Sequence, residues 1–521
     1  MNNNCPSWLK DAVIYSLYPQ SFYDTNNDGI GDLKGITEKL TYIKELGCNA
    51  IWMNPIFESD FLDAGYDVKD FYKIAPRYGT EEDLVNLCET AHKMGMKVLL
   101  DLVAGHTSDA CPWFLESKKA ERNEYSDRYI WAPEKPEGFK KFKKNEEGRE
   151  GYFMYNYYDV QPSINYGFEN VTEPWQLPTN HPVAIQNQDE LINILDFWFK
   201  KGVDGFRVDM ANSLIKNDPD KIGLKRLWSR IRKWMDENYP ENILISEWSM
   251  PDKSIPSGFH IDMMIHTGNK CMTKLFRYEH FNSLATVSGR ILPYGESYFR
   301  KEGLGSFDDF LEEYMPFYDA TKDIGYMSFI TSNHDIKRWS LGRDTEDLKI
   351  AYAFIMTMPG VPINYYGDEI GMQYLSITTK EGSRDRAGSR TPMQWSKGKN
   401  LGFSESDEPY LPVDTSPVAP TVEEQLSDEN SLLNFVKSLI ALKHNHPALR
   451  GDAEFEVVAS GYPVVYDRFC DEERIRVILN PSNKEKNYDD EQLSEVLFSY
   501  NTEIVGSKIK LGSRSCLIYK I

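Results

Sequence analysis

Three acidic residues stand at the ends of short apolar segments that lie far apart in the sequence. Asp209 ends VDGFRVD, Glu247 follows ENILIS, and Asp335 ends MSFITSNHD. Glycoside hydrolysis needs two carboxyl groups at the cleaved bond, one ionised as nucleophile and one protonated as acid. Arg207 precedes Asp209 by two residues, so it should share a strand face with Asp209 and keep that carboxylate ionised.

A single acidic residue at a strand end is most often a helix cap or a solvated loop residue. Here two histidines, His106 and His334, and Arg207 stand at corresponding positions. Six such residues at one edge favour a catalytic site, provided that the apolar segments are parallel strands of one sheet.

The apolar segments alternate with helical patterns, as parallel α/β sheets do. Helices are expected at 37–47, 81–95, 190–202 and 224–238, among others. The pattern predicts a (β/α)8 TIM barrel, with chemistry at the C-terminal ends of its strands. The expected strands are 13–22, 49–57, 97–106, 203–210, 241–248, 259–265, 327–335 and 361–369.

The alternation of strands and helices is interrupted by one insertion and stops before the C-terminal region. Residues 107–170 are polar and irregular, which predicts an inserted domain after the third strand. The barrel then comprises 1–106 and 171–449, and closes with a helix at 431–449. Residues 450–521 read as short strands and predict a C-terminal all-β domain, expected as a β-sandwich.

The composition of the chain argues against some classes of binding partner. The formal charge of -21 argues against nucleic acid or an anionic membrane, which both need clustered positive charge. Neither a secretory h-region nor a membrane-spanning run is evident. Seven cysteines without CxxC spacing suit free thiols in a reducing compartment. We expect a cytoplasmic protein, a monomer or weak oligomer.

The segment DTNNDGIGDLKGI (24–36) begins like a calcium loop. Oxygen-bearing side chains stand at Asp24, Asn26, Asp28 and Asp32, and Gly29 allows a sharp turn. The EF-hand pattern then fails, because its twelfth position should be Glu and here is Gly35. A metal-free turn rich in Asx residues is the alternative.

Five short motifs together resemble the α-amylase family of glycoside hydrolases, over nearly the whole chain. They are DLVAGH (101–106), QPSIN (161–165), GFRVD (205–209), ISEW (245–248) and SNHD (332–335). The resemblance implies a retaining α-glycosidase, with Asp209 as nucleophile, Glu247 as acid/base and Asp335 as the third carboxylate. His106 and His334 match histidines that bind sugar hydroxyls, Arg207 matches the arginine that orients the nucleophile, and Tyr66 matches an aromatic platform under the sugar.

The resemblance also gives the acidic loop a role. Its oligo-1,6-glucosidase-like branch carries DxNxDGxGD after the first strand, and the ligands match Asp24, Asn26, Asp28, the Ile30 carbonyl and Asp32. Calcium suits this all-oxygen set, with magnesium as the alternative. The ion would be structural, because the loop does not carry the catalytic residues.

Several positions depart from the family pattern. Gly105 replaces an Asn that binds a second calcium in many α-amylases, so such a site is not expected here. Ser163 and Ile164 differ from the glucosidase version of their motif, and Ser246 replaces a Gly before the acid/base. Met210 replaces a residue that relates to linkage preference, which therefore stays open between α-1,4 and α-1,6 bonds.

We expect an exo-acting α-glucosidase on short α-glucosides, with a small oligosaccharide or disaccharide as its partner. The alternatives are a glucosyl transferase or isomerase of the trehalose synthase or sucrose isomerase type, an endo-acting α-amylase, a phosphoglucosidase and a non-catalytic transporter subunit. Exo-action is expected from an ion pair between Asp67 and Arg390 at the floor of the site, in DAGYD (63–67) and SRTPMQW (389–395).

Overall fold

Eight parallel strands form a closed barrel in this computed structural model, which confirms the predicted fold. Each strand pairs with the next along the chain, and a bridge between Ile330 and Ile363 closes the ring between the last two. The strands are β1 (Ile14–Leu17), β2 (Ala50–Met53), β5 (Lys97–Leu102), β9 (Gly205–Val208), β10 (Ile243–Ser246), β11 (Ile261–Met264), β14 (Tyr326–Phe329) and β15 (Ile363–Tyr365). The structure describes residues 5–138, 140–265, 269–277, 286–287, 290–291, 296–377 and 384–521.

Helices surround the barrel because each buries one apolar face on the strands. They are α1 (Leu33–Leu46), α2 (Glu81–Lys93), α4 (Pro182–Phe199), α5 (Ile222–Asn238), α6 (Pro251–Ser254), α7 (Phe307–Thr321) and α8 (Thr345–Thr357). Helix α1 begins earlier than expected, since Asp32 caps it by accepting a hydrogen bond from Gly35 N at 2.7 Å. Helix α4 also begins earlier, at a proline that suits a first helical turn.

A hairpin after β2 was not predicted. Strands β3 (Phe57–Ser59) and β4 (Val68–Ile74) pair antiparallel, and the loop between them carries Asp63, Tyr66 and Asp67. The hairpin therefore brings the whole DAGYD motif to the C-terminal edge of the barrel.

The inserted segment forms a small domain, as predicted. It contains α3 (Pro112–Ser117) and a sheet of three short strands, β6 (Trp131–Ala132), β8 (Tyr152–Met154) and β7 (Phe142–Lys144). The end of the inserted segment lies beside the residues that precede the segment, because Ile164 N donates to Gly105 O at 3.1 Å.

The C-terminal region follows α9 (Val422–Ser427) and α10 (Leu432–Asn445). Its strands form one connected antiparallel sheet, so the expected β-sandwich is corrected. Strand β21 pairs with three neighbours, and bulges in its long hairpin with β20 bend the sheet instead of dividing it. The strands are β16 (Glu454–Ser460), β17 (Val464–Phe469), β18 (Arg474–Asn480), β19 (Lys486–Asp489), β20 (Glu495–Val505) and β21 (Lys508–Lys520).

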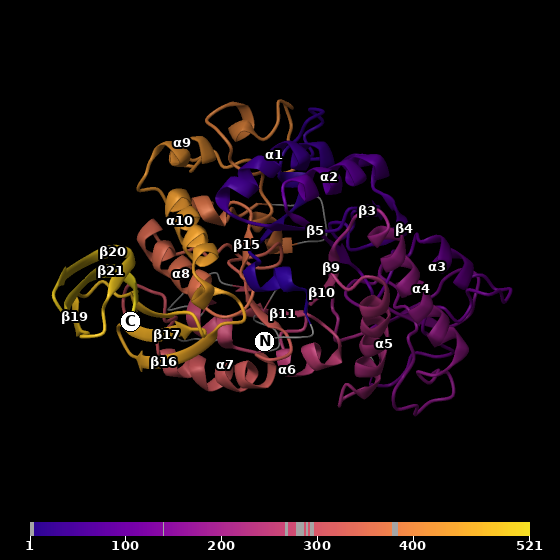
Figure 1. Cartoon of the computed structure of the whole chain (residues 1–521). Coiled ribbons are helices and arrows are strands. Elements are labelled where there is room, and N and C mark those ends of the chain that lie inside the picture. Colours follow the sequence, from indigo (N-terminus) through magenta and orange to yellow (C-terminus); the bar gives the residue numbers. More distant parts are fainter. Residues whose placement is uncertain are drawn as a thin grey trace.

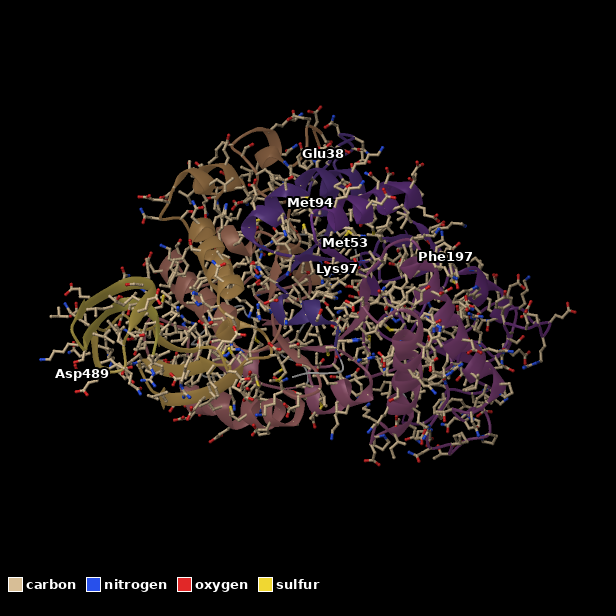
Figure 2. All side chains as sticks on the ribbon, in the orientation of Figure 1. Glu38, Met53, Met94, Lys97, Phe197 and Asp489 are labelled. Atoms are coloured by element: carbon tan, nitrogen blue, oxygen red, sulfur yellow. The ribbon has the colours of Figure 1, made fainter. Side chains whose placement is uncertain are left out.

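The two accessory parts lie on opposite sides of the barrel (Figure 1). The C-terminal sheet, in yellow, packs near α8, while the inserted segment with α3 lies at the far side. Side chains fill the space between strands and helices (Figure 2), where Met53 is buried and Asp489 lies at the outer edge of the C-terminal sheet. Among the described residues, no helix is long and apolar enough to cross a membrane, and all seven cysteines are free thiols.

Candidate active site

Arg207 connects three carboxylates at the C-terminal edge of the barrel. Its Nη1 donates to Asp101 Oδ1 at 2.7 Å and to Asp209 Oδ1 at 3.1 Å, and its Nη2 lies 2.9 Å from Glu247 Oε2. The side chain of Arg207 is fully buried. Burial would lower its pKa, but the surrounding carboxylates raise it well above its usual range. The predicted contact between Arg207 and Asp209 is confirmed.

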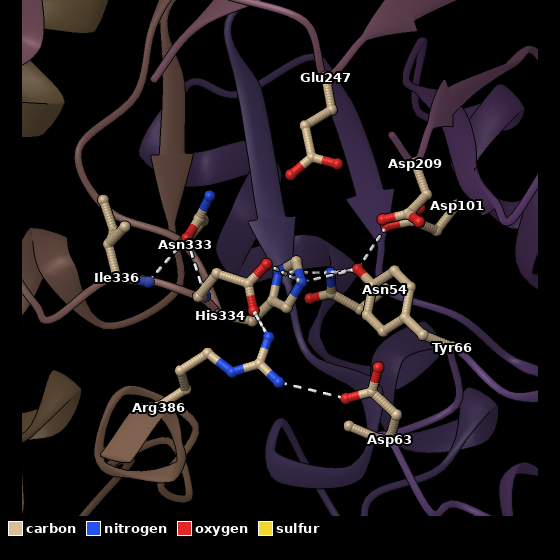
Figure 3. A network of polar contacts seen from close by, with 12 residues as sticks. Asn54, Asp63, Tyr66, Asp101, Asp209, Glu247, Asn333, His334, Ile336 and Arg386 are labelled. Atoms are coloured by element: carbon tan, nitrogen blue, oxygen red, sulfur yellow. Dashed lines mark hydrogen bonds and ion pairs between the residues drawn. The ribbon is translucent and has the colours of Figure 1, made fainter. Parts of the chain in front are cut away.

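Asp209 and Glu247 come from neighbouring strands, β9 and β10, and their carboxyl groups face the same open space (Figure 3). Burial and the charge of Glu247 raise the pKa of Asp209 well above its usual range, and Arg207 offsets only part of this effect. The expectation that Arg207 alone keeps Asp209 ionised is therefore not met. Two carboxyls that meet at one guanidinium are an arrangement in which one could act as nucleophile and the other as acid.

Asp335 has the opposite electrostatic environment. Arg386 Nη1 lies 2.6 Å and Arg390 Nη2 3.2 Å from its Oδ1, while His334 Nε2 lies 3.3 Å from its Oδ2. Burial would raise the pKa of Asp335, but His334, the two arginines and Arg207 together lower it well below its usual range. Asp335 is therefore held in its ionised form.

Tyr66 lies at the centre of the polar network. Its hydroxyl donates to Asp101 Oδ2 at 3.0 Å and accepts from His334 Nε2 at 2.7 Å. The ring of Tyr66 stacks on that of His334, at 5.2 Å between centroids. Asn54 Nδ2 lies 2.9 Å from His334 Nδ1, which assigns Nε2 as the protonated nitrogen. These bonds hold the Tyr66 ring in one orientation.

The two expected sugar-binding histidines are both neutral and buried. Burial lowers the pKa of His106 to about 4 and that of His334 well below its usual range. Both ring nitrogens of His106 have protein partners, since Nε2 bonds Tyr66 O at 2.9 Å and Nδ1 accepts from Asn156 at 3.2 Å. In the structure His106 thus supports the backbone of Tyr66, which is a role the resemblance did not give it.

The expected ion pair between Asp67 and Arg390 is wrong, because each residue has other partners. Asp67 accepts hydrogen bonds from Leu62 N and Asp63 N, each at 3.0 Å, and so stabilises the turn before Tyr66. Arg390 bonds Asp335 and the carbonyl of residue 334.

The ion pair at this place joins Asp63 and Arg386. Arg386 Nη2 lies 3.2 Å from Asp63 Oδ1, while its Nη1 bonds Asp335 (Figure 3). Gln161 Nε2 holds the other Asp63 oxygen at 2.9 Å. DAGYD has an acid on each side of Tyr66, and Arg386 stands four residues before Arg390. Sequence spacing could not show which acid turns toward the pocket.

Two further residues of the network were not singled out as site residues by sequence reasoning. Asp101 is the second-last residue of β5, and burial raises its pKa to about 6 although Arg207 and Tyr66 lower it. Asn54 follows β2. Both stand at the C-terminal end of a barrel strand, and Asp101 is also the first residue of the DLVAGH motif.

The acidic loop before α1 is ordered by its own hydrogen bonds. Asp24 accepts from Asn27 N and Gly29 N, each at 2.8 Å, and from Ser404 Oγ at 2.6 Å. Asp32 binds Thr25 and caps α1. Within the described part of the chain, no group of three or more His, Cys, Asp or Glu side chains is arranged around a common point as metal ligands. The all-oxygen donor set still suits a hard cation, so the metal stays a prediction.

An ammonium group lies where the barrel meets the inserted domain. Lys216 Nζ donates to Ser213 O at 2.7 Å and lies 3.2 Å from Asn156 Oδ1. Burial lowers the pKa of Lys216 to about 7. A side chain at position 105 would meet Asn156 Nδ2 at 2.7 Å from its Cβ, so Gly105 provides the space for this contact.

Comparisons with known proteins agree on the family to which this chain is similar. A family model described as Alpha amylase, catalytic domain, matches residues 16–452. A trehalose synthase/amylase of Mycolicibacterium smegmatis is 31% identical over 481 residues, which cover 85% of this chain and 77% of that protein. An oligo-1,6-glucosidase of Heyndrickxia coagulans is 30% identical over 578 residues, which cover 98% of this chain and 99% of that protein.

Solved structures share the fold over almost the whole chain. A trehalulose synthase superimposes with a TM-score of 0.82 at 23% identity, covering 99% of this chain and 100% of that one. A variant of the isomaltulose synthase of Erwinia rhapontici, in complex with D-glucose, gives 0.81 at 24% identity, with 99% and 100% coverage.

Proposed function

This chain belongs to the α-amylase family, whose members act on α-glucosides, and from that premise we propose that it is a retaining, exo-acting α-glucosidase. Its substrates would be maltose- or isomaltose-type disaccharides and short oligosaccharides. The observation that carries the proposal is the position of Arg386, whose guanidinium bridges Asp63 and Asp335. A rigid bridge of this kind suits the hydroxyls of one terminal glucose, and we expect it to block a further sugar beyond that glucose.

The proposed first step forms a glucosyl ester. Asp209 attacks the anomeric carbon while Glu247 gives its proton to the glycosidic oxygen, so the bond to the departing sugar breaks as the ester bond forms. Arg207 contacts both carboxyls and can stabilise their changing charges. The ionised Asp335 accepts hydrogen bonds from ring hydroxyls and favours positive charge at the anomeric carbon.

In the second step, Glu247 removes a proton from water, and the water oxygen attacks the anomeric carbon. The ester bond breaks, Asp209 regains its charge, and Glu247 regains its proton. Two displacements keep the configuration of the anomeric carbon, so glucose should first appear as the α-anomer.

A glucosyl transferase or isomerase is the second candidate. Its intermediate is the same ester, and a sugar hydroxyl replaces water in the second step. The similarity to a trehalose synthase/amylase over most of this chain favours keeping this candidate. The residues around Asp209 would serve both reactions. The two candidates differ only in whether water or a sugar hydroxyl attacks the glucosyl ester.

Product analysis tests both candidates. The protein is incubated separately with maltose, isomaltose, sucrose, trehalose and maltoheptaose, and products are followed by chromatography and proton NMR. A glucosidase should release α-glucose with little new disaccharide. Isomeric disaccharides formed without net glucose would support the isomerase instead, and early mixed maltooligosaccharides from maltoheptaose would exclude exo-action.

A further inference from the structure

A buried aspartate on β11 contacts the segment that carries Glu247. Asp262 pairs in register with Ser246 across the β10–β11 ladder. Its Oδ1 accepts hydrogen bonds from Ser246 Oγ at 2.5 Å, Ser249 N at 3.1 Å and Trp248 N at 3.3 Å. One carboxyl oxygen therefore binds the residues immediately before and after Glu247.

The turn that follows Glu247 is held by further bonds. Ser249 has a φ of 59°, a left-handed conformation that costs energy for a residue with a side chain. Its Oγ donates to Ile265 O at 2.7 Å and accepts from Ile265 N at 3.0 Å. Asn269 Nδ2 donates to Ser249 O at 2.7 Å. The surroundings of Asp262 thus maintain a backbone shape that Ser249 would not adopt by itself.

Opposite contacts come from the end of β9 and from the residues that follow it. Glu247 N donates to Val208 O at 3.2 Å, and Glu247 Oε2 accepts from Met210 N at 2.9 Å. The segment is therefore fixed from β9 on one side and from β11 on the other. Asp262 itself is fully buried.

We propose that Asp262, together with Ser246, is a positioning device for the general acid, and sets the direction in which Glu247 presents its proton to the glycosidic oxygen. The inference rests on the proposed role of Glu247 as acid. A proton donor works only within hydrogen-bond reach of the departing oxygen, so a small rotation of this segment impairs protonation while leaving Asp209 in place.

The test compares two substrates that differ in their need for an acid. One is the disaccharide that the enzyme cleaves fastest, and the other is α-glucosyl fluoride, whose leaving group needs little protonation. General-acid catalysis contributes roughly 10²–10⁴-fold, so Asp262→Ala should lower kcat on the disaccharide about 10- to 100-fold. On the fluoride, kcat should change by less than about threefold, since the acid contributes little there.

Conservative variants separate positioning from folding. Asp262→Asn retains an oxygen that can accept the same three bonds and should restore most activity on the disaccharide. Ser246→Gly removes one donor and should give a smaller loss with the same substrate pattern. In a Ser246→Gly background, Asp262→Ala should cost less than in the native enzyme, because both residues act through one contact.

A control comes from the other end of the barrel. Asp204, at the start of β9, is also buried and binds Val98 N and Lys97. Asp204→Ala should reduce the folded fraction and affect both substrates equally. Equal losses on both substrates for Asp262→Ala, measured on folded protein, would overturn the positioning role. If Glu247→Gln also fails to discriminate between the substrates, the acid assignment is what fails.

Discussion

At the scale of single residues, the local environments shift the pKa values of the site's carboxyl groups in opposite directions. Asp335 lies among cations that lower its pKa, whereas burial and the charge of Glu247 raise the pKa of Asp209 although both of these carboxyls contact Arg207. Such opposed shifts are what acid–base chemistry at neutral pH requires. The pocket floor depends on another residue pair, Asp63 and Arg386, which fixes the guanidinium that also binds Asp335.

Asp63→Ala should therefore change substrate selection. We expect kcat/KM on a disaccharide to fall about 100-fold or more, because binding energy from the terminal glucose helps to reach the transition state. On maltoheptaose the loss should be smaller, and products longer than glucose should appear. The control is Asp60→Ala in the same loop, whose carboxylate binds the partly exposed Lys69 outside the pocket. If Asp63→Ala still releases only glucose, the bridge does not close the site.

At the scale of elements, the loop and helix α1 form one unit. Asp24 holds the backbone of the loop, and Asp32 both binds Thr25 and caps the helix. A cation bound by Asp24, Asn26, Asp28, the Ile30 carbonyl and Asp32 would stabilise the fold, because only the native loop assembles these oxygens.

Removal of metal tests this prediction. Treatment with EDTA should lower the melting temperature by several degrees while activity at 25 °C stays nearly unchanged, because the loop is separate from the catalytic residues. Added calcium should restore the melting temperature, and magnesium should do so less well. An unchanged melting temperature, together with no metal in elemental analysis of the purified protein, would contradict the site.

At the scale of the whole molecule, buried acids couple stability to pH. Burial raises the pKa of Asp262 to about 7, although hydrogen bonds from Ser246 and Ser249 lower it in part. The unfolded chain has an ordinary value of about 3.9. Since the folded pKa is the higher one, the protonated side chain favours folding. That contribution is fully present below pH ~4 and is lost as the pH rises through about 7.

Asp262→Asn should remove this dependence, because an amide does not titrate in this range. The melting temperature of the variant relative to the native protein should increase from pH 4 to pH 7 and then stay level. Thermal unfolding followed by circular dichroism at several pH values measures the difference, and all other titrating groups are common to both proteins. A difference that is constant with pH would show that Asp262 has an ordinary pKa in the fold.

The sequence by itself determined the barrel and most of its site. Strand-length apolar runs alternate with amphipathic helices, and this pattern admits few architectures. Because parallel strands of a barrel end at one edge, the positions of Asp209, Glu247 and Asp335 were enough to predict a common site. Which residues reach this edge depends on their positions along each strand, and these positions can be read directly from the sequence.

Only the tertiary structure decided which loop residues meet. Asp63 and Asp67 are both acids beside Tyr66, and Arg386 and Arg390 are both near the pocket, so spacing allowed either pair. The choice depends on the β3–β4 turn, in which Asp67 accepts hydrogen bonds from backbone amides and Asp63 is turned toward Arg386. Likewise, Asp262 reaches the segment of Glu247 only through the β10–β11 register. Contacts between elements depend on strand register and turn geometry. Neither can be read from one segment of the chain, because both arise when separate segments pack together.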